Sequence, residues 1–202
     1  KAQPNVDRER LAVIGGSKGA EAALIIAARH PELRAVVAGM PSSVAWQGLD
    51  WNILRQIFTP PDGSWSVGGK AIPFVPYVKE FNGNLLELYT KSLSHVGEHQ
   101  DAIIPIEKSH ATVLLVCGKQ DSLWPSCQMS EQVKERAAKM GGPAVTLLAY
   151  DTAGHGVFGL PVDRTDPNFG QLGGLGGTND GNNDARADSW PKVLAVLAEA
   201  MK

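Results

Sequence analysis

The sequence has few cysteines, no long hydrophobic run and almost no net charge. Its 202 residues carry a formal net charge of −2, so electrostatics give no reason to expect nucleic acid or an anionic membrane as a partner. No apolar run approaches the roughly 20 residues that a membrane-spanning helix needs, and the first residues show no signal-peptide pattern. Two cysteines, Cys117 and Cys127, form neither a metal-binding spacing nor a disulfide framework. We therefore expect reduced thiols and a cytoplasmic protein.

The sequence also lacks a recognisable nucleotide or metal site. Gly15–Gly19 satisfies neither the Walker A nor the G-x-G-x-x-G pattern, and Gly173–Gly177 has no strand before it. His95 and His99 stand four residues apart, but no third ligand accompanies them and a glycine lies between them. We therefore expect no cofactor and no metal.

What the chain does contain is a strand–turn–helix pattern over residues 11–28, LAVIGGSKGAEAALIIAA. Ser17 stands at the tip of the turn in Gly15-Gly16-Ser17-Lys18-Gly19, which matches the G-x-S-x-G nucleophile elbow. Such a turn raises a serine hydroxyl to where a base can reach it, and the helix start offers the backbone N–H of Lys18 to a developing oxyanion. The alternative is a tight glycine turn in which Ser17 merely caps the helix.

Apolar segments alternate with helical patterns along most of the chain. This order predicts an α/β protein with a mostly parallel sheet, right-handed crossovers and helices on both faces. Residues 170–188 are rich in glycine and asparagine and are expected to form an irregular surface loop. The expected strands are residues 11–15, 33–40, 112–117 and 145–150, and the expected helices are residues 18–29, 126–139 and 187–201.

Residues 41–100 interrupt this alternation. The segment is rich in glycine and proline, contains Trp46, Trp51 and Trp65, and has weak helical patches at 49–57 and 85–93. Because it separates two core strands, we expect an insertion that lies over the active edge of the sheet. The alternative is an ordinary long excursion with its own small hydrophobic cluster.

Two further strand ends carry an acid and a base. Asp121 follows the strand 112–117 and His155 follows the strand 145–150, so both are expected beside Ser17 at one edge of a parallel sheet. The order Ser, Asp, His is that of α/β-hydrolases. Ser17 would attack, His155 would take its proton, and Asp121 would orient the imidazole and stabilise its charge. Asp151 is the second candidate for the acid, since it lies in the same loop as His155.

At these residues the chain resembles a known family, the C-terminal domain shared by acyl-CoA thioesterases and bile acid-CoA:amino acid N-acyltransferases. The resemblance implies the C-terminal portion of one α/β-hydrolase catalytic domain over residues 1–202, in which Ser17, Asp121 and His155 are the triad. The similar segments are GGSKGAEAAL, SSVAWQG, GSWSVGGKAIPFVPY, IPIEK, VCGKQDSLWPS, AGHG and GGT…DARADSWPKVLAVL.

Two departures from the family qualify what the resemblance implies. The acyltransferase branch typically uses a cysteine nucleophile, whereas this chain has Ser17, which favours hydrolysis because water can release an ester acyl-enzyme. The family's N-terminal β-sandwich and the strands before the nucleophile are missing from the sequence. We therefore expect a companion polypeptide, most simply the N-terminal portion of the same protein, to cover the strand 11–15 and to supply the second oxyanion donor.

The three candidate residues predict a serine hydrolase, and the resemblance implies that it cleaves an acyl thioester, such as an acyl-CoA. Gly16, Trp46 and Trp124 are expected to line the substrate pocket. A general carboxylesterase is one alternative, because a triad does not distinguish ester from thioester. An acyl-CoA:amino acid N-acyltransferase is another. Outside enzymes, the chain could be an inactive fragment that serves as an interaction piece.

Overall fold

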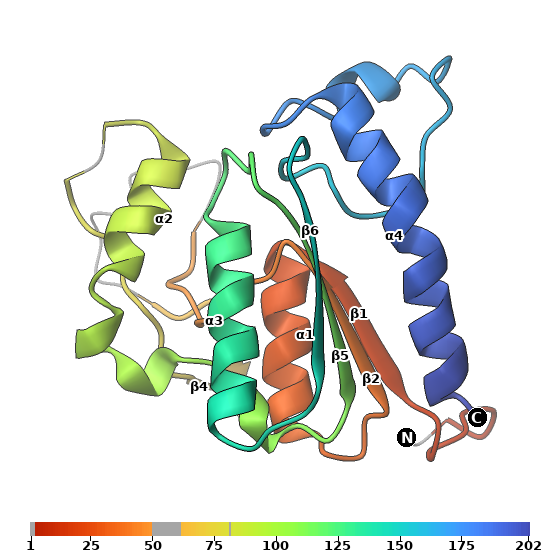
Figure 1. Ribbon diagram of the computed structural model, residues 1–202. Helices are drawn as coiled ribbons and strands as arrows, with labels where there is room; N and C mark the ends of the chain where they lie inside the picture. Colours follow the sequence, from red (N-terminus) through yellow and green to blue (C-terminus); the bar gives the residue numbers. More distant parts are fainter. Residues whose placement is uncertain (1–2, 50–61, 81) are drawn as a thin grey trace.

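The fold is built on a four-stranded parallel sheet with the strand order β1-β2-β5-β6 (Figure 1). The structure, a computed structural model, describes residues 3–49, 62–80 and 82–202. The two central strands are buried on both faces, which explains why they read as continuous apolar runs. The strands are β1 Ala12–Gly16, β2 Ala35–Gly39, β5 Thr112–Gly118 and β6 Val145–Tyr150.

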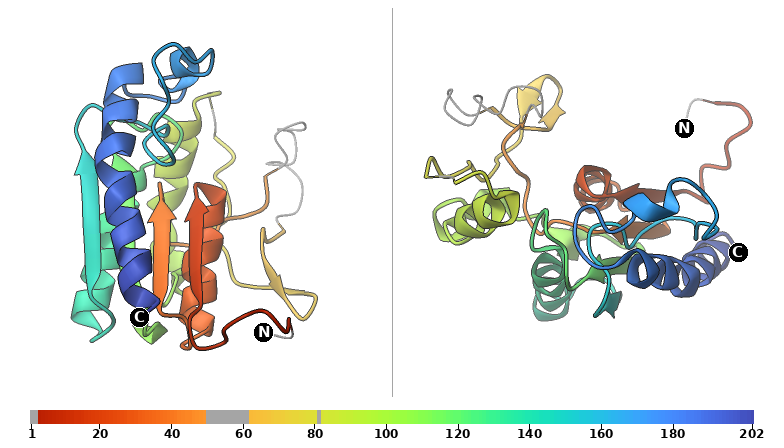
Figure 2. Two further views of the ribbon diagram at one scale, coloured as in Figure 1. Left: turned by 90° about the vertical axis from the view of Figure 1, so that its right-hand side faces the viewer. Right: turned by 90° about the horizontal axis from the view of Figure 1, so that it is seen from above.

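Helices cover both faces of the sheet, as the sequence predicted. On one face α1 (Lys18–Arg29) and α3 (Ser126–Lys139) pack against alternate side chains of β2 and β5. On the other face lies α4 (Asn179–Ala200), which packs against the intervening side chains of the same strands (Figure 2). The expected strand at 145–150 and the expected helices at 18–29 and 126–139 form with the expected bounds.

The last helix begins earlier than expected. We predicted an irregular loop over 170–188 and a helix from residue 187, but α4 begins at Asn179. The side chain of Thr178 caps the helix by accepting the N–H of Gly181 at 2.8 Å. The buried Asn182 accepts the N–H of Gly154 and donates to Leu172, at 2.9 and 3.0 Å. These tertiary hydrogen bonds outweigh the low helix propensity of glycine and asparagine.

The segment between β2 and β5 forms a second hydrophobic cluster beside α3. The expected helical patch at 85–93 is confirmed as α2 (Leu85–Leu93). The other patch, at 49–57, lies outside the described residues apart from Leu49, and so does Trp51. Among its described residues the segment also holds a short hairpin and three 3-10 turns: β3 Ser66–Val67, β4 Lys70–Ala71, η2 Val96–Glu98, η3 Gln100–Ala102 and η4 Ile106–Lys108.

Cys117 and Cys127 form a disulfide, so the expectation of reduced thiols is wrong and the cysteines no longer argue for a cytoplasmic location. Cys117 lies near the end of β5 and Cys127 at the start of α3. Their spacing gave no sign of a bond, because the turn between β5 and α3 is what brings their Cα atoms to 5.2 Å. The disulfide closes the loop that carries Asp121.

Replacing Cys127 with serine is expected to lower the free energy of unfolding. A disulfide over a sequence separation of 10 lowers the conformational entropy of the unfolded chain, which stabilises the folded state by about 2–3 kcal/mol. Urea unfolding followed by tryptophan fluorescence measures the change. The wild-type protein in reductant is the control, and it should unfold at the same urea concentration as Cys127→Ser. An unchanged midpoint for both would show that the disulfide adds nothing to stability.

None of the helices in the described residues is long and apolar enough to cross a membrane.

Candidate active site

Ser17 occupies a sharp turn between β1 and α1. Its backbone has φ 54° and ψ −123°, a conformation that a residue with a side chain adopts only where the surrounding structure enforces it. The turn is held by the N–H of Ser17, which donates to Gly39 at 2.8 Å. It is also tight: a Cβ added to Gly15 would lie 2.1 Å from the carbonyl oxygen of Gly19. Gly15 is therefore required where strand and helix touch, whereas a Cβ added to Gly19 would meet no atom within 4 Å.

The structure brings Ser17, His155 and Asp121 into one hydrogen-bonded row. The Oγ of Ser17 lies 2.8 Å from Nε2 of His155, and Nδ1 of His155 lies 2.9 Å from Oδ2 of Asp121. The three residues follow the ends of β1, β6 and β5, which meet at one edge of the sheet. With Nδ1–H donating to the carboxylate, Nε2 is free to accept the serine proton. This arrangement can activate a hydroxyl as a nucleophile.

The carboxylate of Asp121 is buried and fully hydrogen bonded. Its Oδ1 accepts the N–H groups of Leu123 and Trp124, at 3.0 and 3.3 Å. Its Oδ2 accepts the hydroxyl of Ser126 at 2.6 Å in addition to the bond from His155. These donors fix the orientation of the carboxylate and, through it, the imidazole.

Asp151, the alternative acid, points away from His155. Its side chain is 79% exposed and pairs with Lys119 at 2.6 Å, so Asp121 alone of the two candidates contacts the imidazole. In the rejected metal pair, Nδ1 of His95 lies 3.2 Å from Oε1 of Glu98. Across the described ranges, no group of three or more His, Cys, Asp or Glu side chains is arranged to hold a metal ion.

Side chains from α4 hold the loop that carries His155. The sequence pattern did not predict these contacts. Asn182 accepts the N–H of Gly154 at 2.9 Å, and Arg186 donates from Nε to the carbonyl of Gly156 at 2.6 Å. Both residues lie in the stretch that we expected to be a surface loop. The similarity of DARADSW to the family was the only sequence signal that covered Arg186, and it did not point to a role.

Two of the three expected pocket residues are completely buried. Trp124 is 1% exposed, and its ring centroid lies 5.9 Å from that of His155. Trp46 is 0% exposed, and the ring of Tyr89 lies between it and Trp124, at 5.1 Å from Trp46 and 5.3 Å from Trp124. Gly16 ends β1 directly before the serine. Trp124 is thus a neighbour of the histidine, and a contact of these residues with substrate stays a prediction.

The N-terminus of α1 points its first N–H groups toward the serine end of the site. Lys18 is the first residue of the helix, so its N–H belongs to the groups that a helix leaves without an internal partner. The partial positive charge of a helix N-terminus favours a negative atom at this position. The Lys18 N–H can therefore donate to an oxygen that becomes charged beside Ser17.

Known protein sequences are similar to this chain over most of its length. The sequence profile described as "BAAT / Acyl-CoA thioester hydrolase C terminal" matches residues 1–202. Acyl-coenzyme A amino acid N-acyltransferase 2 of Mus musculus is 26% identical over 156 residues, which cover 76% of this chain and 34% of that protein. Acyl-coenzyme A thioesterase 5 of Mus musculus is 21% identical over 196 residues, covering 95% and 44%. The chain thus spans less than half the length of these relatives.

Solved structures that share the fold of this chain include proteins described as hydrolases and peptidases. A dienelactone hydrolase-like promiscuous phosphotriesterase from metagenomic libraries superposes with a TM-score of 0.54 at 18% identity, covering 100% of this chain and 56% of that one. A puromycin-hydrolysing peptidase of Mycobacterium tuberculosis superposes with a TM-score of 0.54 at 17% identity, covering 97% and 22%. At such identities the likeness concerns the fold alone, and it is the α/β-hydrolase fold.

Proposed function

Because the chain belongs to the BAAT / acyl-CoA thioester hydrolase C-terminal family, we propose that it hydrolyses an acyl thioester, such as an acyl-CoA, with Ser17 as nucleophile. The observation that carries this proposal is the row of contacts from Ser17 Oγ to His155 Nε2 at 2.8 Å and from His155 Nδ1 to Asp121 Oδ2 at 2.9 Å. Within the family, a serine rather than a cysteine favours release of the acyl group to water.

The proposed reaction has two halves. As Ser17 Oγ attacks the thioester carbonyl carbon, its proton passes to His155, and the oxyanion that forms accepts a hydrogen bond from the Lys18 N–H. The C–S bond then breaks, and His155 gives the proton to the leaving sulfur. In the second half His155 takes a proton from water, the resulting hydroxide attacks the acyl ester, and the fatty acid leaves as the proton returns to Ser17. Asp121 accepts the Nδ1–H of His155 in both halves and stabilises the imidazolium.

Acyl transfer to an amino acid is the second candidate, supported by the 26% identity to an N-acyltransferase. The test is a panel of acyl-CoAs and p-nitrophenyl esters, assayed on the intact protein with and without an added amino acid. We expect acyl-CoA hydrolysis with a higher kcat/KM than for the esters and no amide product. Turnover of esters alone would indicate a carboxylesterase, and an acyl-amino acid product would indicate the transferase. No turnover of any substrate would contradict an enzymatic role.

The free edge of β1 supports the proposal that a further segment pairs with this strand. In the described residues β1 pairs only with β2, and Ile14 on this strand is 46% exposed. An open apolar edge presents unpaired N–H and C=O groups that invite aggregation. We propose that a segment outside these 202 residues, most simply from the same polypeptide, pairs with β1 and supplies the second oxyanion donor.

Expression of residues 1–202 alone is therefore expected to give a poorly soluble and nearly inactive protein. The lack of one oxyanion donor lowers the rate by about 10²–10³, and the free edge promotes association. Size-exclusion chromatography and acyl-CoA hydrolysis, compared with the intact protein, measure both effects. A soluble monomer of the 202 residues with full activity would contradict the companion segment.

A further inference from the structure

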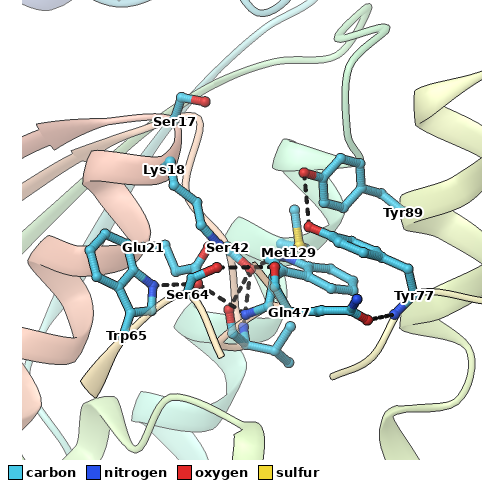
Figure 3. Close-up of polar contacts among 12 residues, drawn as sticks. Ser17, Lys18, Glu21, Ser42, Gln47, Ser64, Trp65, Tyr77, Tyr89 and Met129 are labelled. Atoms are coloured by element: carbon cyan, nitrogen blue, oxygen red, sulfur yellow. Dashed lines mark hydrogen bonds and ion pairs between the residues drawn. The ribbon is translucent and has the colours of Figure 1, made fainter. Parts of the chain in front are cut away.

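Glu21 is a completely buried carboxylate one helical turn after the nucleophile, and the proposed reaction does not use it. Its side chain is 0% exposed and accepts three hydrogen bonds (Figure 3). Oε1 accepts the backbone N–H of Trp46 at 3.0 Å and the indole N–H of Trp65 at 2.7 Å, while Oε2 accepts from Nζ of Lys18 at 2.7 Å. An unpaired charge at this depth would be costly, so these donors decide where the carboxylate and its neighbours lie.

Glu21 contacts the nucleophile elbow through both its backbone and its side chain. Its N–H donates to the carbonyl oxygen of Ser17 at 3.2 Å, which closes the first turn of α1. Its carboxylate holds the ammonium of Lys18, which also lies 5.6 Å from the ring centroid of Trp65. Lys18 is the residue whose backbone N–H faces the proposed oxyanion. Its side chain is thereby bent back along the helix instead of extending freely into solvent.

The same carboxylate anchors the segment between β2 and β5, because Trp46 and Trp65 both belong to it. From Trp46 a chain of ring contacts leads to the base: Tyr89 at 5.1 Å, then Trp124 at 5.3 Å, then His155 at 5.9 Å. The segment therefore touches the nucleophile side of the site through Glu21 and the histidine side through Trp124. These contacts connect the nucleophile side of the site to the histidine side, in addition to the connection that the sheet provides.

Burial shifts the pKa values of Glu21 and Lys18 toward the neutral form of each group, as a low dielectric does. It raises the pKa of Glu21, and the nearby ammonium opposes this shift. It lowers the pKa of Lys18, and the carboxylate opposes that shift in turn. Each partner therefore opposes the loss of charge that burial favours in the other.

We propose that Glu21 is a positioning residue of the active site. Its carboxylate fixes the Lys18 end of helix α1 and locks the segment between β2 and β5 against the nucleophile elbow, so that the oxyanion donor and the serine are set in place before substrate arrives. This inference rests on the proposed function. A small displacement of an oxyanion donor or a nucleophile is enough to slow a reaction by about 10²-fold.

The substitution Glu21→Gln tests this role. Glutamine keeps one oxygen for Trp46 and Trp65 but presents an NH₂ group to Lys18, where a donor meets a donor. In the intact protein we expect kcat for acyl-CoA hydrolysis to fall by about 10- to 100-fold with KM nearly unchanged. A fluorophosphonate probe gives a second readout that needs no knowledge of the substrate. The Ser17 Oγ–P bond forms as fluoride leaves and the proton passes to His155, and this labelling should slow by a similar factor.

Glu107→Gln is the matched control. Glu107 also pairs with a cation, through two hydrogen bonds of 2.7 Å from Arg136, and its side chain is 14% exposed. It lies in η4, before the N-terminal end of β5 and so at the opposite edge of the sheet from Ser17. We expect this variant to lose stability while its kcat and its labelling rate stay at the wild-type values. A purely structural role of Glu21 would give the two variants the same behaviour.

Lys18→Met tests the same positioning role if Glu21→Gln does not fold. It removes the ammonium and keeps the backbone N–H, and we expect the same loss of kcat and of labelling rate. Wild-type kcat and labelling in the variants that fold would overturn the positioning role, as would an equal loss in Glu107→Gln.

Ser17→Ala separates the positioning role of Glu21 from the proposed function. If it still labels and turns over, the proposed function is wrong; if it does neither while Glu21→Gln behaves like wild type, only the role of Glu21 is wrong.

Discussion

Ser17→Ala is expected to lower kcat for acyl-CoA hydrolysis by about 10⁶-fold, the usual effect of removing the nucleophile of a triad. Without Oγ there is no atom to form the acyl ester, and His155 loses the proton that it would accept across 2.8 Å. Alanine should be tolerated by the fold, because the turn is held by the backbone bond from Ser17 to Gly39. Steady-state hydrolysis of acyl-CoA by the intact protein is the measurement.

Thermal unfolding of Ser17→Ala provides the control for folding, since a midpoint near that of the wild type assigns the loss to chemistry. Ser17→Cys is a companion variant. If the choice of nucleophile sets the fate of the acyl group, the cysteine should shift product from free acid toward an amide when an amino acid is supplied. Turnover of Ser17→Ala within about tenfold of the wild type would show that Ser17 is only a turn residue.

The second large effect is expected for Asp121→Asn, at about 10⁴-fold in kcat. The asparagine oxygen can still accept the N–H groups of Leu123 and Trp124, so the loop should keep its shape. Its NH₂ group, however, would lie where Oδ2 now accepts from His155 at 2.9 Å. It would favour the tautomer with Nδ1 as acceptor and Nε2 protonated, which cannot take the proton of Ser17.

Asp151→Asn is the matched control for this second prediction, because Asp151 is exposed and pairs with Lys119 at the same edge of the sheet. We expect it to leave kcat unchanged. A larger loss in Asp151→Asn than in Asp121→Asn would reverse the assignment of the acid and would mean that the loops rearrange when substrate binds.

Local patterns explain why much of the fold could be predicted from the sequence. The helices α1 and α3 and the strand β6 have strong periodicity and clear ends, so their bounds follow from residue types alone. The elbow is also local, since Gly15 and Gly19 meet within a single turn. The strand ends then place Asp121 and His155 beside Ser17, because parallel strands all end at one edge.

The features that escaped prediction depend on contacts between distant segments. The bond between Cys117 and Cys127 requires the path of β5 into α3. The first turns of α4 are held by bonds from Asn182 to other loops rather than by helix propensity. Glu21 looks in the sequence like any polar residue of an amphipathic helix. It is buried because Trp46 and Trp65, from another segment, pack against it and donate to its carboxylate.

In the proposed mechanism, Ser17 carries the acyl group between the thioester and water. Mixing the intact protein with an acyl-CoA, quenching within a single turnover and digesting it for mass spectrometry tests this most directly. We predict an acyl adduct on the peptide that contains Ser17, which forms before free acid appears and decays as the acid is released. Single-turnover release of acid with no adduct on Ser17, or with the adduct on another residue, would contradict this mechanism.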